Sequence, residues 1–151
     1  MTESDVLILL HERYAWGLQM EWAFFGQLRT ATGNGVWMGD IRTMDGWALN
    51  CWPSNGFKSI AFEVKVSKSD FKHELDNPKK REPAMRLSNQ FYFVAPRGLI
   101  APMELPDDCG LMVVQEEKLK ILLAAPIRER EDLPMEFVAS ILRDVKRAHG
   151  M

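Results

Sequence analysis

Apolar and polar residues follow two different periods along the chain, and these periods predict its secondary structure. Residues 3–30 contain no proline and carry apolar side chains at helical spacing, which predicts one helix or a pair of helices. Residues 44–52 are rich in strand formers, and residues 58–67 alternate apolar and polar side chains, which predicts two strands. Asn55-Gly56, which lies between them, suits a tight turn, so we expect an antiparallel hairpin.

The rest of the chain continues this alternation of helices and strands. Either Ser67 or Ser69 could cap a helix that begins after the second strand, and Asn77-Pro78 predicts a break followed by a short second helical stretch. Further predicted elements are a buried strand over 90–95, a hairpin of 111–115 and 119–124, and an amphipathic helix over 135–148. The expected fold is a single α/β domain over residues 1–151, with a mixed sheet flanked by helices in the order α-ββ-α-β-ββ-α.

Composition narrows the class of protein. The chain has 151 residues, 46% of them hydrophobic, and a formal charge of −2, which is typical of one globular domain and excludes a strongly basic nucleic-acid coat protein. Cys51 and Cys109 are isolated, which favours reduced thiols in a cytoplasmic protein. The apolar run Val6–Leu10 is far shorter than a membrane span, and the N-terminus lacks signal-peptide features, so no membrane partner is expected.

The sharpest chemical feature is a set of charged residues on the predicted hairpin. Glu63 and Lys65 share one face of the second strand because side chains alternate along a strand, and the hairpin brings Asp45 near them. Two carboxylates and an ammonium group are the minimum for metal-assisted phosphodiester hydrolysis. Four Asp/Glu-x-Lys pairs occur, but only Glu63/Lys65 lies within an apolar strand. The alternative is that these residues form the solvated face of a half-exposed sheet.

The arrangement resembles the PD-(D/E)XK nuclease superfamily, and within it the small MmcB-like DNA-repair proteins of the branch also found in phages and actinobacteria. The likeness extends from about Tyr14 to Ala125. It rests on four elements in order: Asp45, Trp52-Pro53-Ser54-Asn55-Gly56, Glu63 through Phe71, and Phe91 through Pro96. The resemblance implies a restriction-endonuclease-like core around the mixed sheet.

The resemblance also implies roles for individual residues. Asp45 and Glu63 would bind Mg²⁺ or Mn²⁺ together with the Val64 carbonyl, and Lys65 would position the attacking water or stabilise the transition state. Many members add a carboxylate or glutamine from the first helix. Gln27 is the candidate for that position here, and Glu21 is the other. Acidic residues are usual in the family where this chain has Gly26 and Gln27.

Charge is distributed unevenly along the sequence. Residues 58–97 hold nine Lys and Arg against five Asp and Glu, whereas the rest of the chain is acidic. A solvated helix would give the same pattern, but this surplus flanks the candidate site, where a phosphate backbone would need neutralising. The candidates for contact with DNA are Lys68, Lys72, Lys79, Lys80 and Arg81.

These observations favour a metal-dependent DNA nuclease that acts in DNA repair or phage DNA processing. The alternative is a catalytically weak or silent nuclease-fold protein that binds DNA or a repair partner, and a third possibility is an interaction domain without a nucleic-acid role. Trp37 is a further candidate for stacking on unpaired bases. A chain this short leaves little surface for substrate selection, so a homodimer is also expected.

Overall fold

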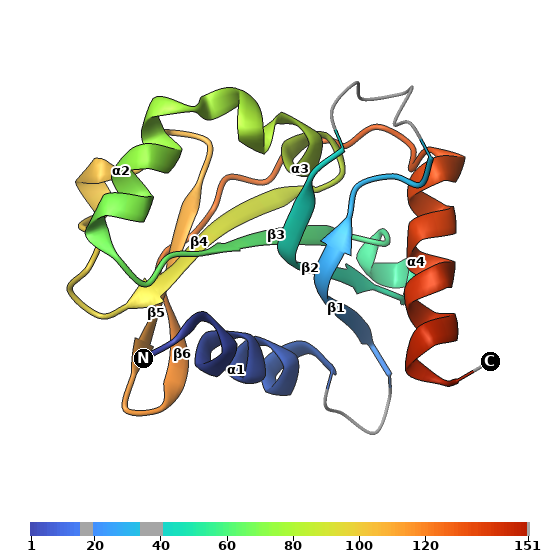
Figure 1. Cartoon of the computed structure of the whole chain (residues 1–151), viewed down its shortest axis with the longest axis horizontal. Coiled ribbons are helices and arrows are strands. Elements are labelled where there is room, and N and C mark those ends of the chain that lie inside the picture. Colours follow the sequence, from blue (N-terminus) through green and yellow to red (C-terminus); the bar gives the residue numbers. More distant parts are fainter. Residues whose placement is uncertain (16–19, 34–40, 151) are drawn as a thin grey trace.

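The computed structural model describes residues 1–15, 20–33 and 41–150, so Trp37 lies outside the described part. It contains a six-stranded mixed sheet flanked by helices (Figure 1). The strands are β1 (Trp22–Arg29), β2 (Thr43–Asn50), β3 (Ser59–Val64), β4 (Gln90–Pro96), β5 (Gly110–Gln115) and β6 (Lys118–Leu123). The α-helices are α1 (Glu3–Ala15), α2 (Lys68–Asp76), α3 (Glu82–Arg86) and α4 (Met135–Ala148), and the 3-10 helices are η1 (Pro53–Asn55), η2 (Pro78–Arg81) and η3 (Pro102–Glu104).

The strands lie in the sheet in their order along the chain. Strands β1, β2 and β3 form an antiparallel meander. Strand β4 runs parallel to β3, and β5 runs parallel to β4. The antiparallel strand β6 ends the sheet. The α/β class, the mixed sheet and the flanking helices are therefore as the sequence predicted.

One predicted element is wrong: the segment before residue 30 is not helical throughout. Helix α1 ends at Ala15, and Trp22–Arg29 form strand β1, so three strands rather than two precede α2. The side chains of β1 alternate between faces, because Phe24 packs on Phe62 while its neighbour Phe25 packs on Trp47 on the other face. Adjacent aromatic residues that contact opposite sides of the sheet fit a period of two and not a helix.

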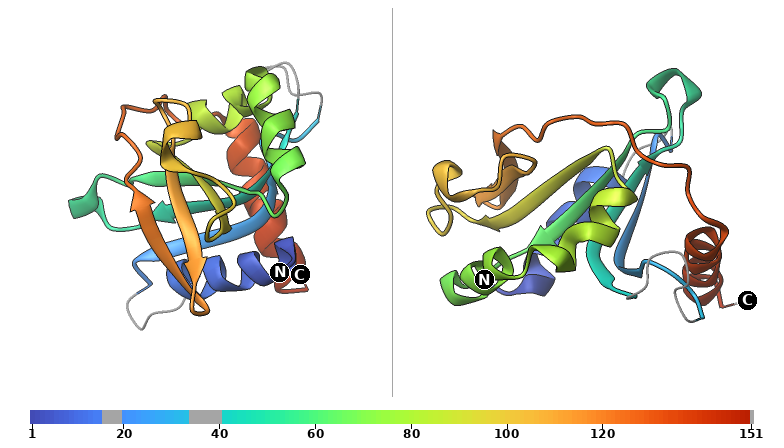
Figure 2. Two further views of the ribbon diagram at one scale, coloured as in Figure 1. Left: turned by 90° about the vertical axis from the view of Figure 1, so that its left-hand side faces the viewer. Right: turned by 90° about the horizontal axis from the view of Figure 1, so that it is seen from above.

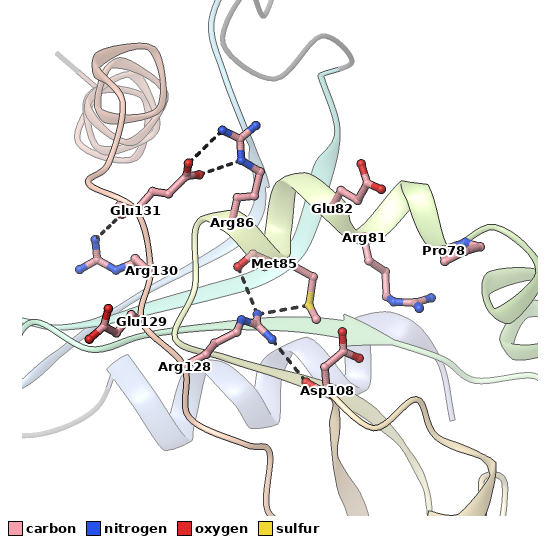
Figure 3. A pocket seen from close by; sticks show the side chains of 10 residues that line it. All are labelled: Pro78, Arg81, Glu82, Met85, Arg86, Asp108, Arg128, Glu129, Arg130 and Glu131. Atoms are coloured by element: carbon pink, nitrogen blue, oxygen red, sulfur yellow. Dashed lines mark hydrogen bonds and ion pairs between the residues drawn. The ribbon is translucent and has the colours of Figure 1, made fainter.

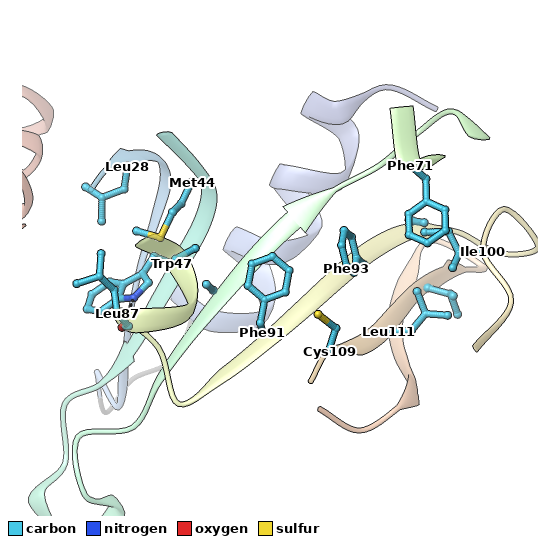
Figure 4. Packing of buried hydrophobic residues seen from close by; sticks show 14 of the residues in the cluster. Leu28, Met44, Trp47, Phe71, Leu87, Phe91, Phe93, Ile100, Cys109 and Leu111 are labelled. Carbon is cyan, nitrogen blue, oxygen red and sulfur yellow. Dashed lines mark hydrogen bonds between the residues drawn. The ribbon is translucent and has the colours of Figure 1, made fainter. Parts of the chain in front are cut away.

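Both faces of the sheet carry a hydrophobic core (Figures 1 and 2). Helix α1 covers one face with Val6 and Leu10. On the other face, Phe71 of α2 and Phe137 of α4 are fully buried in one cluster. Figure 4 shows most of this cluster, with Phe71 labelled. Each fully buried side chain of this size contributes about 1.5–3 kcal/mol through removal of apolar surface from water. These two layers fix the positions of α1 and α2 relative to β2 and β3.

A glycine follows Asp45 for a steric reason. Gly46 lies opposite Gly26 of β1, and a Cβ atom at Gly46 would come within 3.0 Å of two ring carbons of Phe24. That distance is too short for a relaxed contact, so a side chain here would displace the Phe24 ring. The glycine lets the ring lie over β2 directly beside the candidate catalytic aspartate.

The structure confirms the predicted cap of α2. Ser67 precedes the helix in an extended conformation, and its hydroxyl oxygen accepts a hydrogen bond from the Asp70 amide at 3.2 Å. The β2–β3 connection is longer than the expected tight turn, because η1 occupies it; Gly56 follows η1 and has a φ of 67°. Only glycine adopts this left-handed conformation without steric cost.

The described residues contain no helix that is both long and apolar enough to cross a bilayer. The two cysteines are free, with Cys51 exposed and Cys109 buried. Burial raises the pKa of Cys109 to about 12, so its thiol is protonated near neutral pH and is a poor nucleophile.

Candidate active site

Asp45 and Glu63 lie side by side on neighbouring strands. The β2–β3 pairing ends with Gly46 opposite Phe62, and Asp45 and Glu63 are the residues next to this last pair. Asp45 Oδ2 accepts a hydrogen bond of 2.8 Å from the Val64 amide. The two predicted carboxylates and the Val64 backbone, the three proposed metal ligands, thus lie close together.

Lys65 lies between two carboxylates. Its Nζ is 3.3 Å from Glu63 Oε1 and 3.1 Å from Glu74 Oε1, and the lysine side chain is only 11% exposed. Burial alone would lower the pKa of Lys65, but the negative charges of Glu63 and Glu74 raise it above its ordinary value. The ammonium group is therefore charged at neutral pH, where it can donate hydrogen bonds but cannot act as a base.

Glu74 of α2 is a site residue that the sequence analysis missed. Its side chain is 3% exposed, and its second carboxylate oxygen lies 3.5 Å from Arg81 Nη1. The same Arg81 nitrogen donates to the Glu74 carbonyl oxygen at 3.2 Å. Glu74 follows Phe71, another buried residue of α2, by three positions, and this spacing was the available signal that the carboxylate faces the sheet.

The structure corrects the expected contribution of a first helix. Gln27 lies on β1 with a φ of 54°, and its side-chain amide donates to Glu3 Oε1 at 3.0 Å. Glu21, the other candidate, instead accepts hydrogen bonds from Asn50 and Asn55 at the opposite end of the hairpin. The carboxylate that the first helix brings near the site is Glu3, in the first turn of α1, which interacts with Asp45.

Burial changes the acidity of the clustered carboxylates, and their mutual repulsion adds to the change. The pKa of Asp45 is raised to about 6, mainly by burial. The hydrogen bond from the Val64 amide opposes this shift, and the nearby Glu3 adds to it. Burial also raises the pKa of Glu63, with a further contribution from Asp45. A bound cation would favour the charged forms of both carboxylates and so oppose these shifts.

The donor set fits a magnesium-like ion that keeps much of its water. Among the described residues, no group of three or more acidic, histidine or cysteine side chains is arranged to hold a metal by itself. Mg²⁺, however, usually binds through one or two carboxylates together with water and substrate phosphate. Asp45, Glu63 and the Val64 carbonyl could supply the protein side of such a site.

The five candidate DNA-contacting residues occupy different environments. Lys72, Lys79 and Lys80 are exposed on α2 and η2. Lys68 donates to Glu104 at 2.6 Å and to the Leu99 carbonyl at 3.1 Å. Arg81 is only 9% exposed and pairs with Glu74, so it belongs to the interior of the site and not to the outer surface where phosphate contacts were expected.

A separate cavity of about 610 Å³ lies between α3 and the segment before α4 (Figure 3). Arg128 crosses it and donates to the carbonyls of Met85 and Asp108. Arg86 pairs with Glu131 at 2.7 Å at its rim. Because Arg86 and Arg128 already bind groups of the protein, we interpret them as a link between α3 and the segment before α4 and not as an anion site.

A comparison with known proteins shows a similarity in fold to a solved structure. No family model matches the sequence. No curated protein matches it either. A solved structure of a protein of unknown function from Silicibacter pomeroyi is similar, with a TM-score of 0.60 and 17% sequence identity, over 94% of this chain and 81% of that one.

Proposed function

We propose that the protein is a metal-dependent DNA nuclease of the PD-(D/E)XK type, related to MmcB-like proteins, which acts in DNA repair or phage DNA processing. The observation that carries the proposal is the meeting of Asp45, Glu63 and Lys65 where β2 and β3 adjoin. A lysine held between two buried or half-buried carboxylates is unusual for the solvated face of a sheet, because desolvated charges are costly unless they are paired.

Each residue would have a distinct role in hydrolysis. Asp45, Glu63 and the Val64 carbonyl would hold Mg²⁺ or Mn²⁺, which supplies Lewis-acid polarisation and a more acidic water when bound. Lys65 would donate hydrogen bonds to the phosphate oxygens, whose negative charge grows in the transition state. The water oxygen bonds to phosphorus and gives up a proton to solvent, the P–O ester bond breaks, and the leaving oxygen takes a proton from solvent.

The proposal is tested by incubating the protein with linear, nicked, single-stranded and branched DNA in Mg²⁺, Mn²⁺ or EDTA. We expect cleavage with either metal and none with EDTA. Lys65→Ala is expected to lower the rate by about 100-fold or more, the scale for loss of one transition-state donor, while Lys118→Ala leaves it unchanged. Full activity of Lys65→Ala would overturn the assignment. Absence of cleavage combined with salt-sensitive binding would favour the catalytically silent alternative.

The exposed lysines of α2 and η2 are expected to contact the phosphate backbone of DNA. If Lys72 and Lys79 each neutralise one phosphate, the double variant Lys72→Ala/Lys79→Ala should reduce the slope of log affinity against log salt by about 2. Lys146→Ala serves as the control, because this exposed lysine lies on α4 at the far side of the molecule from α2 (Figure 1). Fluorescence anisotropy across a salt series measures both slopes, and an unchanged slope in the double variant would contradict the assignment.

A second copy of the chain is the other proposed partner, and edge strand β6 suits it. Ile121, Leu122 and Leu123 are 43%, 52% and 40% exposed. If two β6 strands pair antiparallel around a twofold axis between Lys120 and Ile121, Lys118 lies opposite Leu123 and Lys120 lies opposite Ile121 of the other copy. No two lysines then face each other. Sedimentation velocity should show a dimer that Leu122→Lys converts to a monomer. A wild-type monomer at the same concentration would contradict this proposal.

A further inference from the structure

A cavity of about 260 Å³ lies directly beside the candidate catalytic residues, between the start of β2 and the η2–α3 segment. Glu63 and Glu74 line the side that faces the active site. The remaining wall has two kinds of surface. Its apolar part includes Met44, Ala84 and Phe91, and its basic part consists of Arg42, Lys80 and Arg81.

The charges of the cavity favour an anionic ligand once the site is occupied. Glu74 is balanced by Lys65 and Arg81. Glu63 would be neutralised by the metal ion of the proposed function. Lys80, which is exposed at the cavity, then leaves the basic character dominant. An apolar wall with cations at its side is complementary to a base and sugar that carry a phosphate.

The size of the cavity restricts what can enter. Pockets for drug-sized ligands have volumes of about 300–1,000 Å³, so this cavity suits a smaller group, such as one base with its sugar. A base pair is too large, and a base of an intact duplex could enter only after it had been unpaired and unstacked, which costs free energy. An already unpaired nucleotide enters without that cost.

We infer that this cavity holds the nucleotide next to the scissile phosphate, and that this nucleotide is unpaired. The preferred substrates are then single strands, flaps and frayed ends rather than intact duplex. The inference rests on the proposed nuclease function, because the catalytic residues define which phosphate is cleaved. It adds a substrate class, which the catalytic residues alone do not determine.

Lys79 and Lys80 provide a matched pair of variants for the test. Both are exposed lysines of η2, but only Lys80 lines the cavity. One oligonucleotide sequence is offered as a single strand, as a duplex with an unpaired flap, and as a blunt duplex. Cleavage is measured in Mg²⁺. Binding is also measured in Mg²⁺, by anisotropy, with each variant made in a Lys65→Ala background, so that the ion can bind while the comparison does not depend on catalysis.

We expect the wild-type protein to prefer the single strand and the flap over blunt duplex by at least about tenfold, the factor that corresponds to 1.4 kcal/mol. Lys80→Ala should reduce this ratio several-fold. Lys79→Ala should weaken the binding of all three substrates equally and leave the ratio unchanged. Ala84→Leu, which narrows the cavity, should also reduce the ratio if its melting temperature shows that it folds.

The outcomes separate this inference from the proposed function. Metal-dependent cleavage of all three substrates at equal rates would overturn the unpaired-nucleotide inference and leave the nuclease proposal standing. Equal effects of Lys79→Ala and Lys80→Ala on the ratio would also overturn it. If no substrate is cleaved but binding favours single strands and depends on Lys80, the cavity assignment is supported and hydrolysis is not.

Discussion

Replacing Glu63 with glutamine is expected to stabilise the metal-free protein at pH 8 and to abolish its stabilisation by Mg²⁺. In EDTA the variant should gain on the order of 2 kcal/mol in the free energy of unfolding, because glutamine removes a charge that the folded state disfavours. The free energy of unfolding of the wild-type protein should increase as the Mg²⁺ concentration rises, because the ion binds the folded state. That of Glu63→Gln should not change with Mg²⁺.

The pH dependence follows from the direction of the pKa shift. Burial, Asp45 and Glu74 raise the pKa of Glu63 from 4.5 to about 8, while Lys65 opposes the shift. Between these two pH values the folded state binds more protons than the unfolded state, so the free energy of unfolding falls as pH rises through this window. Asp45, whose pKa is raised from 3.8 to about 6, acts in the same direction at lower pH. In Glu63→Gln the decline above pH 6 should disappear.

Urea denaturation from pH 4.5 to pH 9, with EDTA and with Mg²⁺, measures both effects. Glu116→Gln is the matched control, since Glu116 belongs to an Asp/Glu-x-Lys pair in the exposed β5–β6 turn. We expect it to follow the wild-type protein. An Mg²⁺-dependent increase in stability that persists in Glu63→Gln would place the ion elsewhere.

Glu74→Ala is expected to destabilise the fold by about 3–5 kcal/mol, the cost of removing one partner from a buried ion pair. The substitution removes a carboxylate that is 3% exposed and that contacts Lys65 and Arg81, both of which are mostly buried. Lys65 would keep Glu63 as its counter-ion, but Arg81 would lose its ion pair with α2. The arginine lies 5.8 Å from the centre of the Phe93 ring, where it is poorly solvated.

Chemical denaturation of Glu74→Ala and of Asp76→Ala provides the comparison. Asp76 is an exposed carboxylate at the end of the same helix, and its removal should change stability by no more than about 0.5 kcal/mol. If the two variants are equally stable, the buried Glu74 network does not hold α2 against the sheet.

Much of the fold was predictable because local patterns and long-range contacts agree. The alternating residues of β3 and the run of apolar residues in β4 are strands in the structure, and Ser67, one of the two serines expected as possible caps, caps α2. The Glu63/Lys65 pair could be chosen from four similar pairs because charged residues within an apolar strand need partners. The structure provides those partners for Lys65.

Other features depend on contacts that are distant in the sequence. Strand β1 contains apolar residues at a spacing that also fits a helix, and its pairing with β2 determines its conformation. The position of Glu3 near Asp45 follows from how α1 packs on the sheet, which no local pattern reveals. Arg81 is similar, because the sequence shows only a basic run and its pairing with Glu74 needs the packed α2–η2 unit.

The most direct test of the central claim is hydrolysis of DNA by wild-type protein, Glu63→Gln and Glu116→Gln, assayed side by side in Mg²⁺. The proposed site predicts cleavage by the wild-type protein and by Glu116→Gln. It also predicts a loss of about 1,000-fold or more in Glu63→Gln, because the metal ion and its activated water would be lost together. Cleavage by Glu63→Gln at the wild-type rate would contradict the assignment of Asp45, Glu63 and Lys65 as the active site.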